Sequence, residues 1–273
     1  MASPEQLDLT ARSGRVKHAR RLATRAFRDR TGEFLAEGPQ AVREAVAAGV
    51  VLEVFATAEA TQRYADIVAA SPDWQVVEPE IVAEVADAVA PQGMVARCRT
   101  VVRSLADLDL AGARLVVVCA DVRDPGNAGA VIRCADAVGA DAVLLAGDCV
   151  DPLGPKVVRS TVGSLFHLPV VVERDVPVAI AAVRAAGLQV LAADGGGDLG
   201  LYDPDLDLAA PSAWLLGNEA WGLPPDRRSL ADKVVSIPIY GRAESLNLAT
   251  AAAVCLYASA QGQRALDPPV QRP

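Results

Sequence analysis

The chain has 273 residues and a formal net charge of −8, with 52% hydrophobic and 22% charged side chains. This composition excludes a largely disordered chain and is typical of a globular protein with one large or two small domains. No apolar run is long enough to span a bilayer, and the first residues lack a signal-peptide pattern, so we expect a cytoplasmic protein. The five cysteines have no CxxC spacing and there are only two histidines, which argues against disulfides, a metal site or a Ser-His-Asp triad.

The charge is unevenly distributed. Residues 1–30 hold eight basic and three acidic side chains, a net charge of +5, so the remainder carries −13. Such asymmetry suggests a local surface for a polyanion on an otherwise acidic body. The alternative is a basic helix that only contacts solvent. Residues 13–30 have the pattern of that helix.

The first hundred residues predict a small α/β unit over about residues 13–98. After the basic helix, apolar runs and proline-initiated helices alternate. The expected strands are 33–37, 52–56, 75–78 and 94–98, and the expected helices are 39–48, 61–70 and 79–89.

Residues 100–113 are rich in polar and small side chains, and we place a domain boundary there. The β-branched run 115–119 is typical of a strand buried on both faces of a parallel sheet. Strands are expected at 142–145, 168–172, 189–192, 213–216 and 234–239, and helices at 127–138, 155–160, 177–186 and 247–261. This alternation predicts an α/β fold with a mostly parallel sheet covered by helices on both faces. Residues 267–273 contain three prolines and are expected to be disordered.

The helix 127–138 follows a turn at Pro125-Gly126, with Asn127 a candidate N-cap. Arg133 falls roughly opposite the apolar face of that helix. A helix N-terminus after such a turn can bind an anion, and an arginine one turn further can hold a phosphate. The alternative is an exposed arginine on a surface helix. The glycine spacing does not match the G-x-G-x-x-G dinucleotide-binding motif.

Residues 214–248 contain two short apolar runs that stop at polar residues, glycine or proline. The first leads into G-N-E-A-W-G-L-P-P and the second into I-P-I-Y-G-R-A-E-S-L-N-L. Rigid strands that end in such loops often form ligand sites, although two core strands joined by a loop would look similar. The following helix is apolar nearly all round, so it lies deep in the domain or packs against a second subunit.

Taken together, these segments resemble the SpoU (TrmH-type) family of RNA ribose 2′-O-methyltransferases in the SPOUT superfamily. Three motifs carry the resemblance over about residues 113–262. They are Asn127-x-Gly129 with Arg133 and Gly139; Gly217-Asn218-Glu219 with Gly222-Leu223; and Ile237-Pro238 with Ser245-Leu246-Asn247-Leu248. The N-terminal unit is similar to a small ribosomal-protein-like RNA-binding domain often fused to this catalytic domain.

The resemblance implies a trefoil-knotted catalytic domain that binds S-adenosylmethionine and forms a homodimer through its C-terminal helix. The implied organisation is an RNA-binding domain at 1–99, a linker at 100–113, a methyltransferase domain at 114–262 and a flexible tail at 263–273. The cofactor-binding candidates are Leu216, Gly217, Ile237 and Leu246. The catalytic candidates are Asn127, Arg133, Glu219, Ser245 and Asn247. The candidate RNA contacts are Arg15, Lys17, Arg20, Arg21, Arg25 and Arg28.

The implied reaction is methylation of a ribose 2′-hydroxyl, in ribosomal RNA rather than tRNA because tRNA members often lack the N-terminal domain. A tRNA methyltransferase, a catalytically silent RNA-binding homologue and a nucleotide-dependent oxidoreductase are the alternatives. Arg133 is a poor general base because a guanidinium stays protonated, so we expect it to grip phosphate and stabilise the developing alkoxide. The proton would pass to water, to Glu219 or to the cofactor.

Overall fold

The computed structural model describes residues 9–265, so the expected disordered segment 267–273 lies outside the described residues. The chain divides into two compact units. One contains the chain up to Val101 together with Asp151–His167, and the other contains Val102–Val150 and the chain from Leu168 onward. Among residues 9–265, no helix is both long and apolar enough to cross a membrane.

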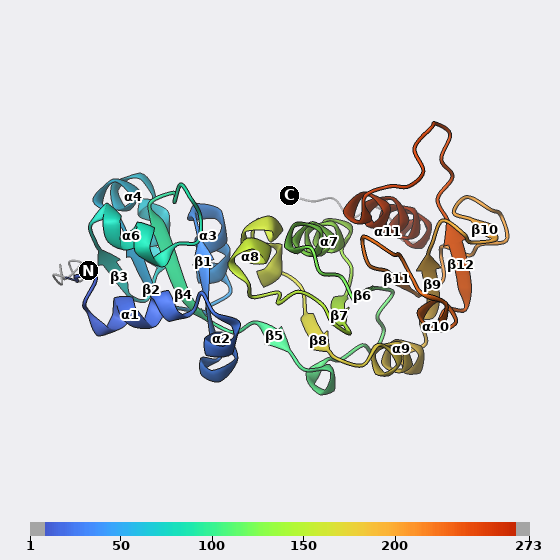
Figure 1. Cartoon of the computed structure of the whole chain (residues 1–273), viewed down its shortest axis with the longest axis horizontal. Helices are drawn as coiled ribbons and strands as arrows, with labels where there is room; N and C mark the ends of the chain where they lie inside the picture. Colours follow the sequence, from blue (N-terminus) through green and yellow to red (C-terminus); the bar gives the residue numbers. More distant parts are fainter. Residues whose placement is uncertain (1–8, 266–273) are drawn as a thin grey trace. The chain divides into compact units, whose positions relative to one another are not determined.

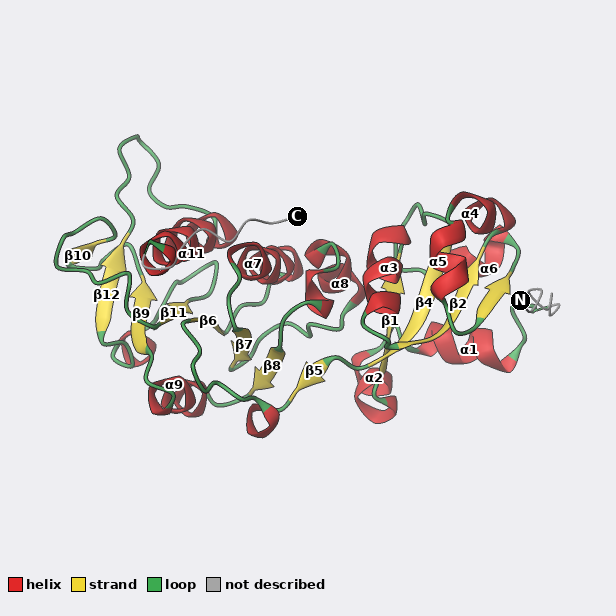
Figure 2. Ribbon diagram, turned by 180° about the vertical axis from the view of Figure 1, so that it is seen from behind, coloured by secondary structure: helices red, strands yellow, loops and turns green. Residues whose placement is uncertain are grey.

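The N-terminal unit is built on a four-stranded mixed sheet in the order β1-β4-β2-β3. β4 pairs antiparallel with β1 and β2, whereas β2 and β3 are parallel. Helices α1 and α6 pack against one face of this sheet, and α3 packs against the other with α5 beside it (Figure 2). The strands are β1 (Glu33–Glu37), β2 (Val51–Ala56), β3 (Trp74–Val76) and β4 (Met94–Arg99). The helices are α1 (Gly14–Arg21), α2 (Arg25–Thr31), α3 (Pro39–Ala47), α4 (Ala58–Arg63), α5 (Ala65–Ala70) and α6 (Pro79–Val85).

The single helix expected at 13–30 is wrong, because the chain breaks between α1 and α2. No glycine or proline marks the break. The Arg28 guanidinium donates hydrogen bonds to the carbonyls of Leu22 (2.7 Å) and Ala23 (3.0 Å), and these bonds satisfy carbonyl groups just beyond the end of α1. Arg28 in turn pairs with Asp151, which is distant in sequence. The break therefore depends on a non-local contact that helical periodicity cannot reveal.

The segment Asp151–His167 belongs to the N-terminal unit although it lies between two strands of the larger sheet. It carries α8 (Pro155–Thr161) and the short helix η2 (Ser164–Phe166). Arg159 of α8 pairs with the buried Glu37 (2.9 Å) and with Asp87 (2.8 Å). These ion pairs give Arg159 a structural role.

The larger unit contains an eight-stranded, entirely parallel sheet in the order β10-β12-β9-β11-β6-β7-β8-β5. The central strands are apolar on both faces and fully buried, as expected for a sheet covered on two sides. Within the expected linker 100–113, β5 pairs with the edge of this sheet. The strands are β5 (Val102–Arg103), β6 (Leu115–Ala120), β7 (Ala142–Ala146), β8 (Val170–Glu173), β9 (Gln189–Ala193), β10 (Leu199–Gly200), β11 (Ser212–Leu216) and β12 (Lys233–Ser236).

Helices cover both faces of the large sheet (Figure 1). α7 (Pro125–Val138) and α11 (Leu248–Arg264) pack against each other on one face. α9 (Val176–Ala185) contributes Val176, Ala179, Ile180 and Val183 to the core on the other face, on the same side as the short α10 (Pro225–Arg228). α11 is anchored by Trp214 of β11, whose indole Nε1 donates to Ser259 Oγ at 2.8 Å.

Candidate functional site

A cavity of about 300 Å³ lies in the larger unit at the carboxyl ends of three neighbouring parallel strands, β12, β9 and β11. Open α/β sheets usually bind ligands at this edge. Five of the predicted site residues line the cavity: Gly217, Glu219, Ile237, Ser245 and Leu246. Segments that are separate in the sequence therefore meet around one hollow.

The loop after β11 is closed tightly on itself. The backbones of Asn218 and Gly222 exchange two hydrogen bonds of 3.0 and 2.8 Å, which leave a three-residue tip between them. A Cβ on Gly217 would lie 2.4 Å from the carbonyl oxygen of Gly222, so only glycine fits there. Gly222 itself has φ +67°, a conformation that favours glycine. The glycines of the second motif thus fix the shape of the cavity wall.

Glu219 connects this loop to the segment before α7. Its Oε1 accepts the amide hydrogen of Asp124 at 3.1 Å, and its Oε2 accepts that of Arg123 at 3.4 Å. The neighbouring Asn218 donates from Nδ2 to the carbonyl of Asp121 at 2.6 Å. The second motif therefore holds the backbone of residues 121–124, just before the helix that carries the first motif, through three hydrogen bonds.

The first and third motifs are also joined directly. Asn247 Nδ2 donates to Asn127 Oδ1 at 2.9 Å. Asn247 Oδ1 also caps α11 by accepting the amides of Ala249 (2.9 Å) and Thr250 (3.3 Å). The N-cap role suggested for Asn127 is wrong, because α7 begins at Pro125 and the Asp124 carboxylate caps it.

The remaining predicted residues are placed differently. Arg133 is exposed on α7, and it makes no ion pair with any residue in the range 9–265. Leu216 is buried as the last residue of β11 and does not line the cavity. Cys149 lies near the first motif, with its Sγ accepting the Val122 amide at 3.3 Å; burial raises the pKa of this thiol to about 12. It is therefore a neutral thiol at physiological pH and not a nucleophile.

Sequence reasoning missed Asp194 and Gly195, which line the cavity directly after β9. From sequence, the segment Asp-Gly-Gly-Gly has the composition of a flexible loop. The available signal was its position at the carboxyl end of a buried strand next to β11. The Asp194 carboxylate accepts the amide of Gly196 at 2.8 Å and lies 3.6 Å from Arg228, so the loop has a defined shape.

Comparison with known proteins identifies the family. The SpoU rRNA Methylase family model matches residues 114–257, which contain all three motifs. The chain belongs to the SpoU rRNA methylase family. A second model, the MRM3-like substrate binding domain, matches residues 14–96.

Several SpoU relatives resemble the chain over nearly its whole length. The 23S rRNA (guanosine(2553)-2′-O)-methyltransferase RlmP of Bacillus subtilis is 34% identical, over 91% of this chain and 96% of the relative. An AdoMet-bound rRNA methyltransferase from Sinorhizobium meliloti superposes with a TM-score of 0.81 at 31% identity, over 96% of this chain and 98% of the other. AviRb from Streptomyces viridochromogenes in complex with AdoMet gives 0.82 at 32% identity, over 93% and 99%.

In this SpoU protein, the six predicted RNA contacts divide into two groups. Arg28 is 5% exposed and held by Asp151, so we withdraw it as an RNA contact. Arg15 pairs with Glu53 and Asp73, and Glu53 also accepts from Arg97, so Arg15 is part of an internal charge network. The other four side chains are exposed, and we call them the basic face: Lys17, Arg20, Arg21 and Arg25. Within this set, Arg20 pairs with Glu84 at 3.2 Å and Arg25 lies 3.7 Å from Asp29.

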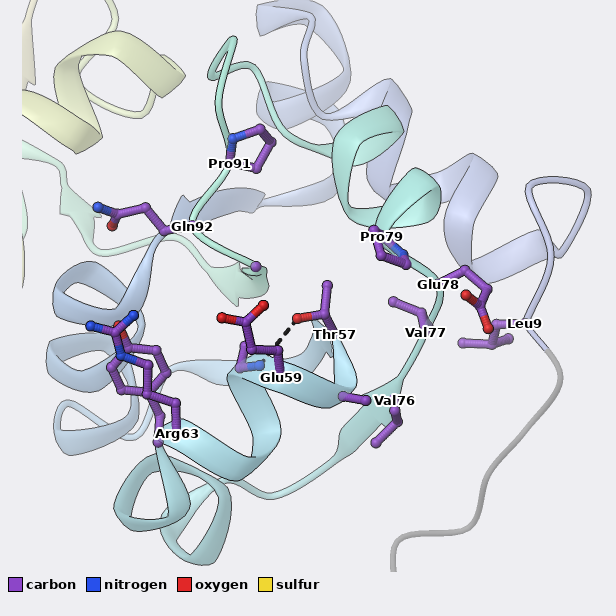
Figure 3. A pocket seen from close by; sticks show the side chains of 14 residues that line it. Leu9, Thr57, Glu59, Arg63, Val76, Val77, Glu78, Pro79, Pro91 and Gln92 are labelled. Atoms are coloured by element: carbon purple, nitrogen blue, oxygen red, sulfur yellow. Dashed lines mark hydrogen bonds between the residues drawn. The ribbon is translucent and has the colours of Figure 1, made fainter.

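A hollow of about 780 Å³ in the N-terminal unit contains none of the motif residues (Figure 3). It lies at the ends of β2 and β3, where Thr57 caps α4 by accepting the Ala60 amide at 3.1 Å. Its polar edge carries Glu59 and Glu78 as well as Arg63. Carboxylates repel phosphate, so we do not place the RNA backbone in this hollow.

Proposed function

We propose that this protein transfers a methyl group from S-adenosylmethionine to a ribose 2′-hydroxyl of ribosomal RNA. The observation that carries the proposal is the meeting of the three SpoU motifs at one cavity. Gly217, Ile237 and Leu246 line it, and Asn247, between the lining residues Leu246 and Leu248, is hydrogen-bonded to Asn127 of the first motif. The relatives named above, similar over more than nine-tenths of the chain, support the same activity.

The chemistry of the cavity fits S-adenosylmethionine. Outside helices and strands, no backbone hydrogen bond within residues 9–265 is donated by Ile237 or by residues 239–246, so these amides are available to a ligand. Ala193, Ile237 and Leu246 give an apolar lining suited to the adenosine, and Asp194 and Glu244 supply carboxylates suited to ribose hydroxyls and to a cationic group. When bound, the cofactor supplies an electrophilic methyl group.

We assign the protein side chains as follows. Arg133, exposed and without an ion-pair partner in the described chain, grips the phosphate next to the target ribose and stabilises the developing alkoxide. Asn127 orients the ribose, and Ser245 completes the pocket. Glu219 clamps two loops because both of its carboxylate oxygens accept amides, and the proton of the hydroxyl passes to water.

The RNA substrate, the roles of the two domains and the location in the cell are further parts of the proposal. The match of residues 14–96 to a substrate-binding domain favours ribosomal RNA over tRNA, with the basic face holding phosphates. Residues 1–99 would form the RNA-binding domain, 114–262 the knotted methyltransferase domain, and 100–113 the linker between them. A protein that modifies ribosomal RNA must meet ribosomes or their precursors, and we propose a cytoplasmic location on that ground.

We further propose a homodimer through α11. The helix buries one face, which includes Ala252, Cys255 and Leu256, and leaves Tyr257 56% exposed. An exposed aromatic side chain on the outer side of a largely apolar helix is suited to contact with a second copy of the chain. Analytical ultracentrifugation of the protein and of Tyr257→Glu tests this assignment, and a monomeric wild-type protein at micromolar concentration contradicts it.

The activity is tested by two measurements. Calorimetry should show binding of S-adenosylmethionine and none of NAD, whereas NAD binding alone would point to an oxidoreductase. Mapping of 2′-O-methyl groups in RNA from a deletion strain should show one site lost from ribosomal RNA and restored by the wild-type gene. Loss of a 2′-O-methyl group from tRNA instead would make tRNA the substrate. If both RNAs kept all their 2′-O-methyl groups, the protein would be a catalytically silent homologue.

A further inference from the structure

Trp221 is an exposed aromatic side chain at the edge of the candidate methyl-transfer site. Its side chain is 53% exposed, whereas the other two tryptophans, Trp74 and Trp214, are 7% and 0% exposed. Single exposed apolar residues are common on proteins and need no explanation by themselves. Three features of its setting distinguish Trp221.

The first feature is its place on the closed loop after β11. Trp221 is the last of the three tip residues between Asn218 and Gly222, whose backbones are hydrogen-bonded to each other. Every other residue from Gly217 to Gly222 lines the cavity, but Trp221 does not. Its ring therefore stands outside the cavity, where it is available to the RNA and not to the cofactor.

The second feature is that the loop is held rigidly. Glu219 and Asn218 make three hydrogen bonds to the backbone of residues 121–124, and Gly217 has no room for a side chain. Because the loop is already ordered, less conformational entropy is lost when its aromatic ring binds a ligand.

The third feature is a cation against the ring. The Arg123 guanidinium lies 5.3 Å from the centroid of Trp221 and is itself 55% exposed. Its Nη2 donates to Asp148 at 2.5 Å, which fixes the orientation of the guanidinium. Indole and guanidinium planes are both surfaces on which unpaired RNA bases stack.

We propose that Trp221, supported by Arg123, is a stacking platform for an unpaired base of the substrate strand, next to the ribose that receives the methyl group. The proposal rests on the proposed function, because it takes single-stranded RNA as the ligand. A 2′-hydroxyl that must enter a cavity at a strand edge requires a nucleotide turned out of its helix, and a ring at the edge offers the displaced base a partner.

Stacking of a base on Trp221 can be measured by fluorescence because Trp221 is exposed and the other two tryptophans are buried. Stacking of a base on the indole quenches its fluorescence, and the two buried tryptophans give a constant background. We expect short single-stranded oligoadenylate to quench the emission of the wild-type protein, and an RNA duplex of equal length to leave it nearly unchanged. Trp221→Phe should abolish the quenching. This measurement does not require methylation, so it tests stacking even if the proposed activity fails.

A second measurement links the platform to the reaction. With protein-free ribosomal RNA from a deletion strain, Trp221→Ala should raise KM for RNA on the order of tenfold, because stacking on an aromatic side chain contributes about that much per base. Trp221→Phe should restore most of the loss, since a ring is retained. Affinity for S-adenosylmethionine should not change. The matched control is Tyr202→Ala, which removes a 65% exposed aromatic side chain elsewhere in the same unit.

The outcomes separate the possibilities. Unchanged emission with oligoadenylate, or a Trp221→Ala variant with wild-type KM, overturns the proposal while leaving the methyltransferase assignment intact. Quenching that depends on protein concentration without RNA would place Trp221 between two copies of the chain and also overturns it. Quenching by oligoadenylate without any methylation of ribosomal or transfer RNA supports the platform and overturns the proposed activity.

Discussion

The hydrogen bond between Asn127 and Asn247 gives a quantitative test of how the site is assembled. Asn247 makes three bonds: two cap α11, and one of 2.9 Å reaches Asn127 Oδ1. Replacing an N-cap by alanine costs about 1 kcal/mol of stability. A neutral side-chain hydrogen bond at an exposed position contributes about 0.5–1 kcal/mol. We therefore expect Asn247→Ala to lower the free energy of unfolding by about 1.5–2 kcal/mol.

A double-mutant cycle isolates the link between the two residues. Asn127→Ala should lose only the link, about 0.5–1 kcal/mol, and the double variant should be no less stable than Asn247→Ala alone. Asn247→Asp keeps a capping carboxylate but places it against the Asn127 oxygen. It should therefore retain the cap and lose the link, and its stability should fall between those of the wild type and Asn247→Ala.

The assay is urea unfolding followed by the fluorescence of Trp214, in a background where Trp74 and Trp221 are phenylalanine. Trp214 is fully buried and donates to Ser259 on α11, so its emission reports the packing of that helix. Additive effects of the two alanine substitutions would refute the link. A loss for Asn247→Ala well below about 0.5 kcal/mol would refute the cap as well.

Four further predictions concern charge. Arg133→Ala and Arg133→Lys should lower kcat by about 10²-fold or more without changing affinity for S-adenosylmethionine, as measured by single-turnover methylation; near-normal turnover would exclude the proposed role. Neutralising the basic face should weaken RNA binding and reduce the slope of log K against log salt by about 0.7–0.9 for each phosphate that the variant no longer neutralises. Arg28→Ala should destabilise the N-terminal unit by about 3–5 kcal/mol, because the partly buried Asp151 loses its partner, and should leave the salt slope unchanged in filter-binding titrations. Burial raises the pKa of Glu33, but hydrogen bonds from Arg97 and His18 outweigh it, so this pKa lies below its ordinary value. The stabilisation by the Glu33 carboxylate is therefore present at neutral pH and is lost as the pH falls through that lowered pKa. The difference in the free energy of unfolding between the wild type and Glu33→Gln should shrink on acidification.

The sequence predicted the six longer strands of the large sheet and five of the residues that line the cavity, but it missed the two-residue strands β5 and β10 and the cavity residues Asp194 and Gly195. β6, β7, β9 and β11 lie where apolar runs predict them, because strands buried on both faces are largely apolar. The three motifs were also expected to converge, on the strength of the family resemblance. The cavity collects residues from the second and third motifs, and hydrogen bonds tie in the first.

Long-range charge pairing is what the sequence could not reveal. Arg15 and Arg28 carry the same charge as Arg21 and have the same helical setting, yet two of the three are used inside the protein. Their carboxylate partners, Glu53 and Asp151, are distant in the sequence. A run of basic residues therefore predicts a basic surface only where no distant carboxylate folds back to pair with them inside the protein. The three-dimensional structure is needed to find those carboxylates.

Glu219 shows how the motif residues divide their tasks. From sequence it was equally suited to shaping the pocket or to accepting a proton. In the structure its two oxygens accept the Arg123 and Asp124 amides. The side chain of Asn247 similarly caps α11 and donates to Asn127. Both residues connect loops that carry the cavity, whereas Arg133 is the motif side chain left without an ionic partner in the described chain. Variants of Glu219 and Asn247 should therefore lose stability and cofactor affinity together, and variants of Arg133 should lose turnover alone.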